Sequence, residues 1–171
     1  MEGRDGRVLY REVQRFTQPW IWALVLAISI FAIYASVQQL VLGVPFGSNP
    51  APDGVMLVIG VIFGLAFPVF FSSLNLSTEV RPDGLYIRFF PFHLSYRGIA
   101  LRELAHFEVT TYDPIKDYGG WGIRYGPRGK AYNVSGNRGL RVDLLDGDSL
   151  LIGSQRPEEL LSALASAVSA Q

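Results

Sequence analysis

The chain contains no cysteine and only two histidines among its 171 residues. Without cysteine it has no disulfide bond, no thiolate metal site and no cysteine nucleophile. A metal ion needs three or four protein ligands, and His106, Glu108 and Asp113 follow no recognised ligand spacing. No serine–base pair or carboxylate pair stands out either. The sequence therefore predicts no catalytic residues, no metal and no cofactor.

A net charge is also missing. Fifteen Lys and Arg residues balance fifteen Asp and Glu residues over the whole chain, and residues 77–171 carry eleven of each. Bulk nucleic-acid binding needs a basic face. The balance therefore argues against a nucleic-acid partner.

Two long stretches have no charged residue at all. They are residues 20–42 and residues 55–76, and Asp53 is the only charge between them. A bilayer core about 30 Å thick needs roughly 20 helical residues, so both stretches can span it. We expect a transmembrane helical hairpin over residues 20–73, with spans at 20–42 and 55–73. A signal peptide has a shorter apolar core, and a buried helical hairpin of a soluble protein is the remaining alternative.

The arginines predict the orientation of this hairpin. The loop at residues 43–54 has no Lys or Arg, whereas arginines flank both spans on the other side: Arg4, Arg7, Arg11, Arg15, Arg81 and Arg88. Positive residues stay on the cytoplasmic side of a membrane. We therefore expect a multi-pass protein of the cell membrane, with both termini in the cytoplasm.

Residues 1–19 form a basic juxtamembrane segment by composition. Leu9, Val13 and Phe16 recur at helical spacing, and arginines occupy the other faces. This pattern predicts an amphipathic helix lying along the lipid headgroups, and a frayed tail is the alternative. Trp20 and Trp22 suit the interface, where an indole keeps one polar edge in water. These five residues are the first predicted membrane contacts.

Small residues predict how the two spans pack. Pairs spaced four apart allow close backbone approach in lipid; they are Ala23 and Ala27, Ala32 and Ser36, and Gly60 and Gly64. The short loop holds the spans together, which favours packing within the hairpin. Self-association into a homo-oligomer is the alternative. Neither span contains Asp, Glu, Lys, Arg or His, so we do not expect the hairpin alone to transport ions.

The rest of the chain alternates polar and apolar residues with the two-residue period of strands. Turn sequences such as Asp146-Gly147 separate the runs. We expect strands at 74–80, 85–90, 93–101, 107–112, 121–125, 130–134, 140–145 and 149–152. Short, regularly spaced strands indicate a sandwich or barrel and not a parallel sheet. Pro157, followed by two glutamates, begins a C-terminal helix.

This order of strands and one closing helix resembles the bacterial branch of the pleckstrin-homology-like fold. The segments Tyr118-Gly-Gly-Trp-Gly-Ile-Arg124, Ala131-Tyr-Asn-Val-Ser-Gly136 and Leu151-Ile-Gly-Ser-Gln-Arg-Pro157 are together similar to a family of small bacterial membrane proteins of uncharacterised function. The resemblance implies an α+β chain in which the hairpin precedes a cytoplasmic pleckstrin-homology-like antiparallel β-barrel or sandwich at residues 74–171. Lipid-binding relatives grip phosphoinositides with basic residues around the first hairpin. The turn at residues 81–84 has a single Arg, so the resemblance does not extend to that activity.

Polar residues gather around the Gly-Gly-Trp segment. They predict a docking loop or a polar pocket, with candidate docking residues Tyr112, Asp113, Lys116, Asp117, Tyr118, Trp121 and Arg124. A purely structural role is the alternative: Gly119 and Gly120 allow a sharp turn, Trp121 fills the barrel and Arg124 pairs with a carboxylate.

An aromatic corner follows the second expected strand, at residues 89–92. The first strand leaves the bilayer and the second returns toward it, so Phe90 and Phe92 are two further predicted membrane contacts. The alternative is that these rings alternate into the domain core.

Together these features predict a non-enzymatic, membrane-anchored module. Its partners would be the lipid bilayer and an unidentified membrane or cytoplasmic protein whose assembly or regulation it serves. One alternative is a sensor that binds a small molecule or lipid in the barrel mouth. The other is an enzyme that uses the polar cluster from Asp113 to Arg124.

Overall fold

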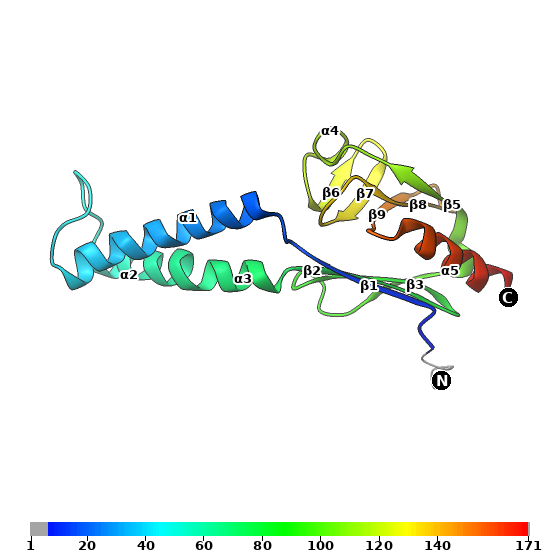
Figure 1. Cartoon of the computed structure of the whole chain (residues 1–171), viewed down its shortest axis with the longest axis horizontal. Helices are drawn as coiled ribbons and strands as arrows, with labels where there is room; N and C mark the ends of the chain where they lie inside the picture. Colours follow the sequence, from blue (N-terminus) through cyan, green and yellow to red (C-terminus); the bar gives the residue numbers. More distant parts are fainter. Residues whose placement is uncertain (1–6, 171) are drawn as a thin grey trace. The chain divides into compact units, whose positions relative to one another are not determined.

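The computed structural model describes residues 7–170, which form two compact units. The helical unit is Phe16–Leu74, and the sheet unit combines the described residues up to Arg15 with those from Asn75 onward. Residues 1–6, with Arg4 among them, and residue 171 lie outside the described part of the chain. Figure 1 labels the elements of both units.

Two apolar helices build the helical unit. The first joins α1 (Pro19–Ser36) to a π-helical turn, η1 (Val37–Val41). The second joins α2 (Asp53–Ile59), a π-helical stretch η2 (Gly60–Ala66) and α3 (Phe67–Ser73). Both are long and apolar enough to cross a bilayer, and many of their large apolar side chains are exposed. The prediction of two long apolar helices is confirmed.

Small residues lie where these two helices meet. A Cβ atom added at Gly60 would stand 2.4 Å from Ser36 Oγ, and one added at Gly64 would stand 2.7 Å from Ile33 Cγ1. The Ser36 hydroxyl donates a hydrogen bond of 3.2 Å to the carbonyl oxygen of residue 56. The two glycines therefore pack within the hairpin.

Ala23 and Ala27 do not take part in this contact. Both are exposed, whereas α1 buries Val25, Ser29, Ala32 and Ala35. A four-residue spacing marks a face of a helix, but it does not say which face meets the partner helix. The glycine pair decides which face of α1 meets the second helix, because α1 can approach closely only where the second helix has no side chains.

The irregular backbone of the second helix has a local cause. Pro68 lies in the first turn of α3, has no N–H to donate, and would clash with the carbonyl four residues earlier in a regular helix. The π-helical stretch η2 directly precedes it, and a shifted hydrogen-bond ladder accommodates such a residue.

Two separate sheets make up most of the sheet unit. Sheet A is antiparallel and has the order β1 (Tyr10–Arg15), β2 (Asn75–Arg81), β3 (Gly84–Phe90), β4 (Arg97–Ala100). Sheet B has the order β5-β8-β9-β7-β6, with bounds β5 (Leu104–Thr111), β6 (Gly122–Gly126), β7 (Gly129–Asn133), β8 (Arg138–Leu144) and β9 (Ser149–Gly153). The chain is thus of mixed α+β class, and the two sheets share no strand pairing among the described residues. A closed barrel, one of the predicted forms, is therefore wrong.

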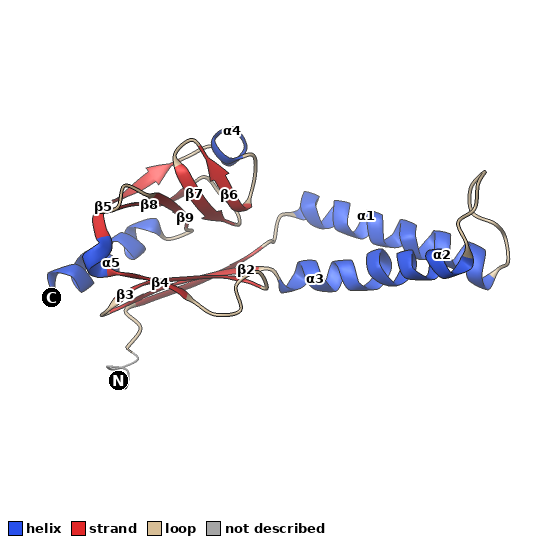
Figure 2. Ribbon diagram, turned by 180° about the vertical axis from the view of Figure 1, so that it is seen from behind, coloured by secondary structure: helices blue, strands red, loops and turns tan. Residues whose placement is uncertain are grey.

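The C-terminal helix α5 (Pro157–Ser169) closes the core between the sheets. It buries Leu160, Leu164 and Ala167 and contacts both sheets, through β1 and β2 on one side and β5 and β8 on the other. Figure 2 shows it lying between them. The helix predicted after Pro157 is confirmed. Fully buried side chains of both sheets complete this core, among them Leu76, Val80, Leu85, Leu140, Val142 and Ile152.

The amphipathic helix predicted near the N-terminus is wrong, because residues 10–15 form β1. This strand pairs with β2 along its whole length, from Tyr10↔Val80 to Arg15↔Asn75. Its buried positions are Tyr10, Glu12 and Gln14, and two of these are polar. The apolar residues alone therefore indicated the period of a helix, whereas the buried positions follow the two-residue period of a strand. The buried polar residues have hydrogen-bond partners that the sequence alone does not reveal.

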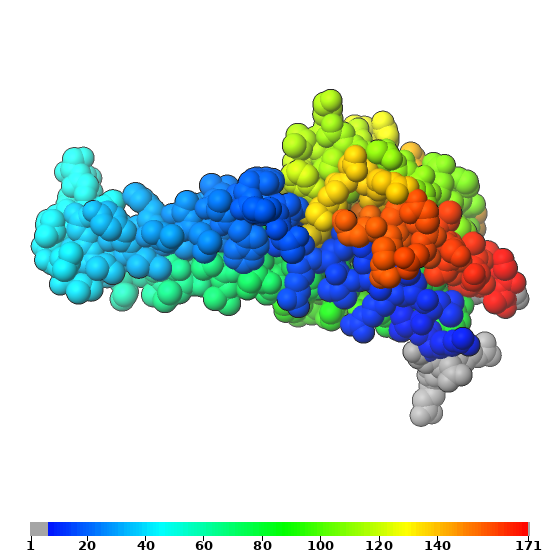
Figure 3. All heavy atoms as spheres, viewed as in Figure 1, coloured from blue at the N-terminus to red at the C-terminus, as the bar shows by residue number. Residues whose placement is uncertain are grey.

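Those partners lie just before α5. Glu12 Oε2 accepts hydrogen bonds of 2.6 Å from the Tyr10 hydroxyl and from the Ser154 hydroxyl, and Oε1 accepts one of 2.8 Å from the Gln155 amide. Gln14 donates to the Gly153 carbonyl at 2.7 Å. Figure 3 shows the blue atoms of β1 beside the orange atoms of α5 at the surface of this unit.

Three further details differ from the prediction. Residues 93–96 do not belong to the third expected strand, since β4 begins only at Arg97. A short helix, α4 (Pro114–Tyr118), occupies the expected loop after β5. Finally, β7 and β9 pair in parallel, although the other pairings are antiparallel, because the β6–β7 hairpin is added to the side of β9 and not to the end of a meander.

Candidate functional site

The helix α4 organises the polar cluster that the sequence singled out. The Asp113 carboxylate caps it by accepting hydrogen bonds from the amides of Ile115 and Lys116, at 3.0 and 3.1 Å. These bonds from the Lys116 and Ile115 amides hold the pKa of Asp113 below its usual value. The left-handed backbone of Gly119, with φ of 70°, ends the helix. Asp113 thus has a structural role as the helix cap.

Two of the predicted docking residues are buried. Tyr112 and Tyr118 are 6% and 8% exposed and form a small core with Ala131 and Leu151. Their rings meet edge to face, with centroids 6.0 Å apart. Burial raises the pKa of Tyr112 to about 12. These two tyrosines therefore hold α4 on sheet B and expose little of their side chains.

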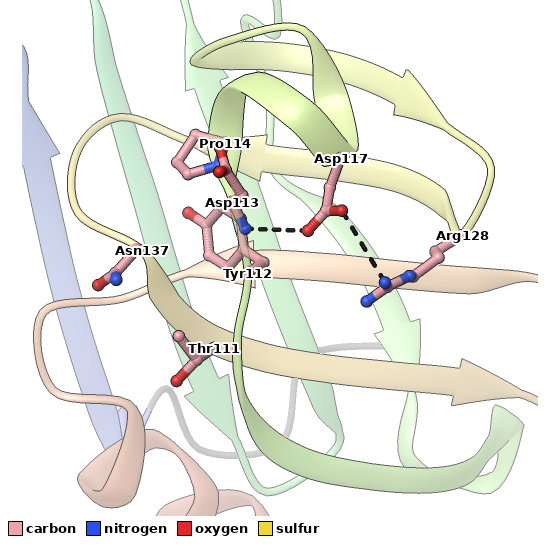
Figure 4. Close-up of a pocket in the computed structure, with 7 residues that line it drawn as sticks. All are labelled: Thr111, Tyr112, Asp113, Pro114, Asp117, Arg128 and Asn137. Atoms are coloured by element: carbon pink, nitrogen blue, oxygen red, sulfur yellow. Dashed lines mark hydrogen bonds and ion pairs between the residues drawn. The ribbon is translucent and has the colours of Figure 1, made fainter.

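An open depression of about 510 Å³ lies beside α4. Figure 4 shows the residues that line it, which are Thr111, Tyr112, Asp113, Pro114, Asp117, Arg128 and Asn137. The Asp117 carboxylate accepts a hydrogen bond of 2.9 Å from the Asp113 amide and lies 3.9 Å from the Arg128 guanidinium. The acidic side chains of this depression are therefore engaged in holding the loop.

The structure places Trp121 and Arg124 together, but not as predicted. Arg124 Nε donates a hydrogen bond of 3.0 Å to the Trp121 carbonyl oxygen, so the expected pairing of Arg124 with a carboxylate is replaced by a bond to the backbone. The Trp121 indole donates to the Gly136 carbonyl at 3.4 Å. Trp121 is half-buried and does not fill a barrel.

Three exposed residues around α4 and β6 were missed by sequence reasoning, namely Ile115, Tyr125 and Arg128. Ile115 and Tyr125 are 64% and 76% exposed, and β6 is the terminal strand of sheet B. Tyr125 continues the alternation of Trp121 and Ile123, but it lies on the terminal strand of sheet B and is exposed. We call the set Ile115, Lys116, Trp121, Arg124, Tyr125 and Arg128 the α4–β6 surface; all of them but the half-buried Trp121 are exposed.

The histidines lie elsewhere. His106 and Glu108 are exposed, with Nε2 and Oε2 3.8 Å apart. Within residues 7–170 no group of three His, Asp or Glu side chains could hold a metal ion. His93 is buried, with its ring 5.5 Å from that of Tyr132, and its burial lowers its pKa.

The predicted membrane contacts fall in both units. In the sheet unit, Leu9, Val13 and Phe92 are 39%, 47% and 62% exposed, and Phe90 is half-buried. In the helical unit, Trp20 is 58% exposed. The Trp22 indole donates to the Phe16 carbonyl at 2.8 Å, and the rings of both residues pack on Phe71.

Comparison with known proteins gives a family whose function is not known. The profile described as "Family of unknown function (DUF6141)" matches residues 1–171. No curated protein matches the chain.

Proposed function

The chain belongs to the DUF6141 family of unknown function, and from that premise we propose that it is a membrane-anchored adaptor. The two apolar helices span the inner membrane of a bacterium, and both termini lie in the cytoplasm. The sheet unit is a pleckstrin-homology-like module that binds another protein. The two sheets and closing helix support the fold, and the uncharged helices and the arginines beside them support the topology.

The observation that carries a docking role is the exposed edge of β6. Among residues 7–170 this strand pairs with β7 alone, and an edge strand offers unpaired backbone groups to another chain. Successive residues of a strand point to opposite faces, so Arg124 and Tyr125 lie on opposite sides of this edge. An added strand would contact both.

The charge around this edge indicates the chemistry of the partner. Lys116, Arg124 and Arg128 are exposed. Lys116 lies 3.6 Å from the Asp113 carboxylate and Arg128 lies 3.9 Å from the Asp117 carboxylate, and both carboxylates also accept hydrogen bonds from the loop backbone, so the three cations outnumber the two carboxylates beside them. We therefore propose an acidic, extended segment of a partner protein, which adds to β6 as a further strand.

The topology is tested by labelling, because the chain has no cysteine of its own. Ser48→Cys lies in the loop between the helices and Leu145→Cys in the turn after β8, and both positions are exposed. A membrane-impermeant maleimide added to intact cells should label the first and not the second. The opposite pattern would contradict the proposed orientation.

Docking is tested with a photo-cross-linking amino acid at Tyr125, using the full chain in native membranes. Leu145, which is 71% exposed, is the matched control position. We expect a protein adduct at position 125 that is lost in Lys116→Glu/Arg124→Glu, and slower hydrogen exchange of the β6 amides in the complex. Adducts of equal yield at both positions would contradict the proposal. A bound small molecule with no protein adduct would favour the sensor alternative.

A further inference from the structure

The outer face of sheet A carries an excess of arginine. Residues directly opposite each other in antiparallel strands point to the same side, and the pairing places Arg11 and Arg15 of β1, Arg81 of β2 and Arg88 of β3 on the face turned away from the core. Glu79 is the carboxylate among them. The balanced charge of the whole chain does not reveal this local excess of arginine.

Glu79 is already committed to its neighbours. It is 3% exposed, accepts bonds from Arg81 at 2.7 Å and from the Tyr96 hydroxyl at 2.8 Å, and lies 3.4 Å from Arg11. Burial opposes its ionisation, but the bonds from Arg81 and Tyr96 lower the pKa of Glu79 overall. The four arginines and Glu79 therefore leave this face a surplus of three positive charges. The nearby Asp83 carboxylate, which accepts a hydrogen bond from the Tyr86 hydroxyl, reduces the surplus to two when it is included.

The Tyr96 ring stacks against two of these guanidinium groups. The Arg88 guanidinium stacks 4.8 Å from the centre of the Tyr96 ring, and that of Arg81 lies 5.5 Å from it. Arg88 Nε is buried and makes no hydrogen bond to any residue of the described chain. A stacked guanidinium keeps its charge and its outer N–H donors for an anion.

The covalent chain joins one end of this face to the apolar helices. Arg15 stands four residues before Pro19, where α1 begins, and its pairing partner Asn75 stands two residues after Ser73, where α3 ends. At no more than about 3.6 Å per residue, these connections are shorter than about 15 Å. Arg88 pairs with the second residue after Asn75. Arg15 and Arg88 are thus the two arginines nearest the helix ends along the strands.

Exposed apolar side chains follow at this same end. Phe90 pairs with Asn75, and the loop after it exposes Phe92 and Leu94, at 62% and 79%. Basic residues beside exposed apolar ones are typical of surfaces that rest in the headgroup region of a bilayer.

We propose that this face of sheet A docks on the membrane that holds the helices, by binding anionic lipid headgroups. Arg15 and Arg88 bind lipid phosphates, and Phe92 and Leu94 enter the apolar boundary below them. The inference rests on the proposed membrane anchoring. Its basic groups come from three strands of the sheet face and not from the turn at residues 81–84.

The experiment places an environment-sensitive fluorophore at Leu94→Cys in the full chain, with Leu145→Cys as the control position. The protein is reconstituted in vesicles of phosphatidylcholine alone, or of phosphatidylcholine mixed with phosphatidylglycerol, and lipid-borne quenchers report contact. We expect quenching at position 94 and not at 145, stronger in the anionic vesicles. Arg15→Gln/Arg88→Gln should lower the ratio of docked to undocked label about 30-fold, which corresponds to about 1 kcal/mol for each arginine near an anionic leaflet.

Two comparisons separate this effect from simple misfolding. Arg102→Gln/Arg138→Gln removes the same charge from exposed positions in other parts of the sheet unit and should leave the ratio unchanged. In the labelled chain that keeps all its arginines, raising the salt concentration should weaken docking by screening these charges, without any change of fold. Free glycerol phosphate should compete weakly, since only a leaflet offers phosphates and an apolar boundary together.

Equal quenching at positions 94 and 145, or equal docking in neutral and anionic vesicles, would overturn the inference. Either result, combined with outside labelling of Ser48→Cys, would leave the membrane anchoring intact. Failure of both the Ser48→Cys labelling and the quenching would instead remove the proposed function on which the inference rests.

Discussion

Replacing Glu12 by alanine should detach the N-terminal strand from the sheet unit. Glu12 is 6% exposed and its carboxylate accepts three hydrogen bonds, from the Tyr10 hydroxyl, the Ser154 hydroxyl and the Gln155 amide. A hydrogen bond to a charged group contributes about 1.5–3 kcal/mol. Because part of this is recovered when water reaches the freed donors, we expect a net loss of about 3–5 kcal/mol, which is below the full sum for three such bonds.

The loss should be local to β1 and the segment before α5. Hydrogen exchange of the full chain in lipid nanodiscs measures it directly, because the amides of β1 are protected by pairing with β2. A loss of about 4 kcal/mol raises the fraction of the open strand, and with it the exchange rate, by about a thousandfold, until global unfolding limits it.

Glu159→Ala is the matched control, since it removes the same charge from the same region. Its carboxylate accepts a hydrogen bond of 3.0 Å from Arg156 and its side chain is 61% exposed. An exposed ion pair of this kind contributes at most about 1 kcal/mol. If β1 exchanged at the same rate in both variants, the idea that Glu12 fastens this strand would be refuted.

Two further predictions concern the helix contact and the small tyrosine core. Gly60→Ala should destabilise the hairpin by about 1–3 kcal/mol, because its Cβ atom would meet Ser36. Gly54→Ala is the control, since nothing lies within 4 Å of a Cβ atom added there. Equal midpoints of the two variants in a denaturant titration in mild detergent would contradict the packing. The raised pKa of Tyr112, about 12, means that the unfolded chain loses its tyrosine proton first as the pH rises. Stability should therefore be unaffected below pH 10 and fall by about 3 kcal/mol between pH 10 and pH 12. In urea unfolding of Tyr112→Phe, the free energy of unfolding should fall by correspondingly less between pH 10 and pH 12. The same fall in the variant as in the unchanged chain would assign the effect to other groups.

The sequence by itself determined the features that depend on local composition and period. Two uncharged stretches of helical length predicted two long apolar helices, and the C-terminal helix begins where proline and two glutamates suit a helix N-terminus. Most strands of residues 75–153 follow from alternation with turn residues between them, because the two-residue period is a property of each strand alone.

The tertiary structure decided what depends on partners distant in the chain. Residues 10–15 became a strand because Glu12 and Gln14 meet polar groups at residues 153–155, which no local pattern shows. Tyr112 and Tyr118 became core because α4 folds over sheet B, while Tyr125 became exposed because β6 is an edge strand. The arginines of sheet A meet on one face only through the pairing of β1, β2 and β3, and the whole helical unit separates β1 from the other two strands in the sequence.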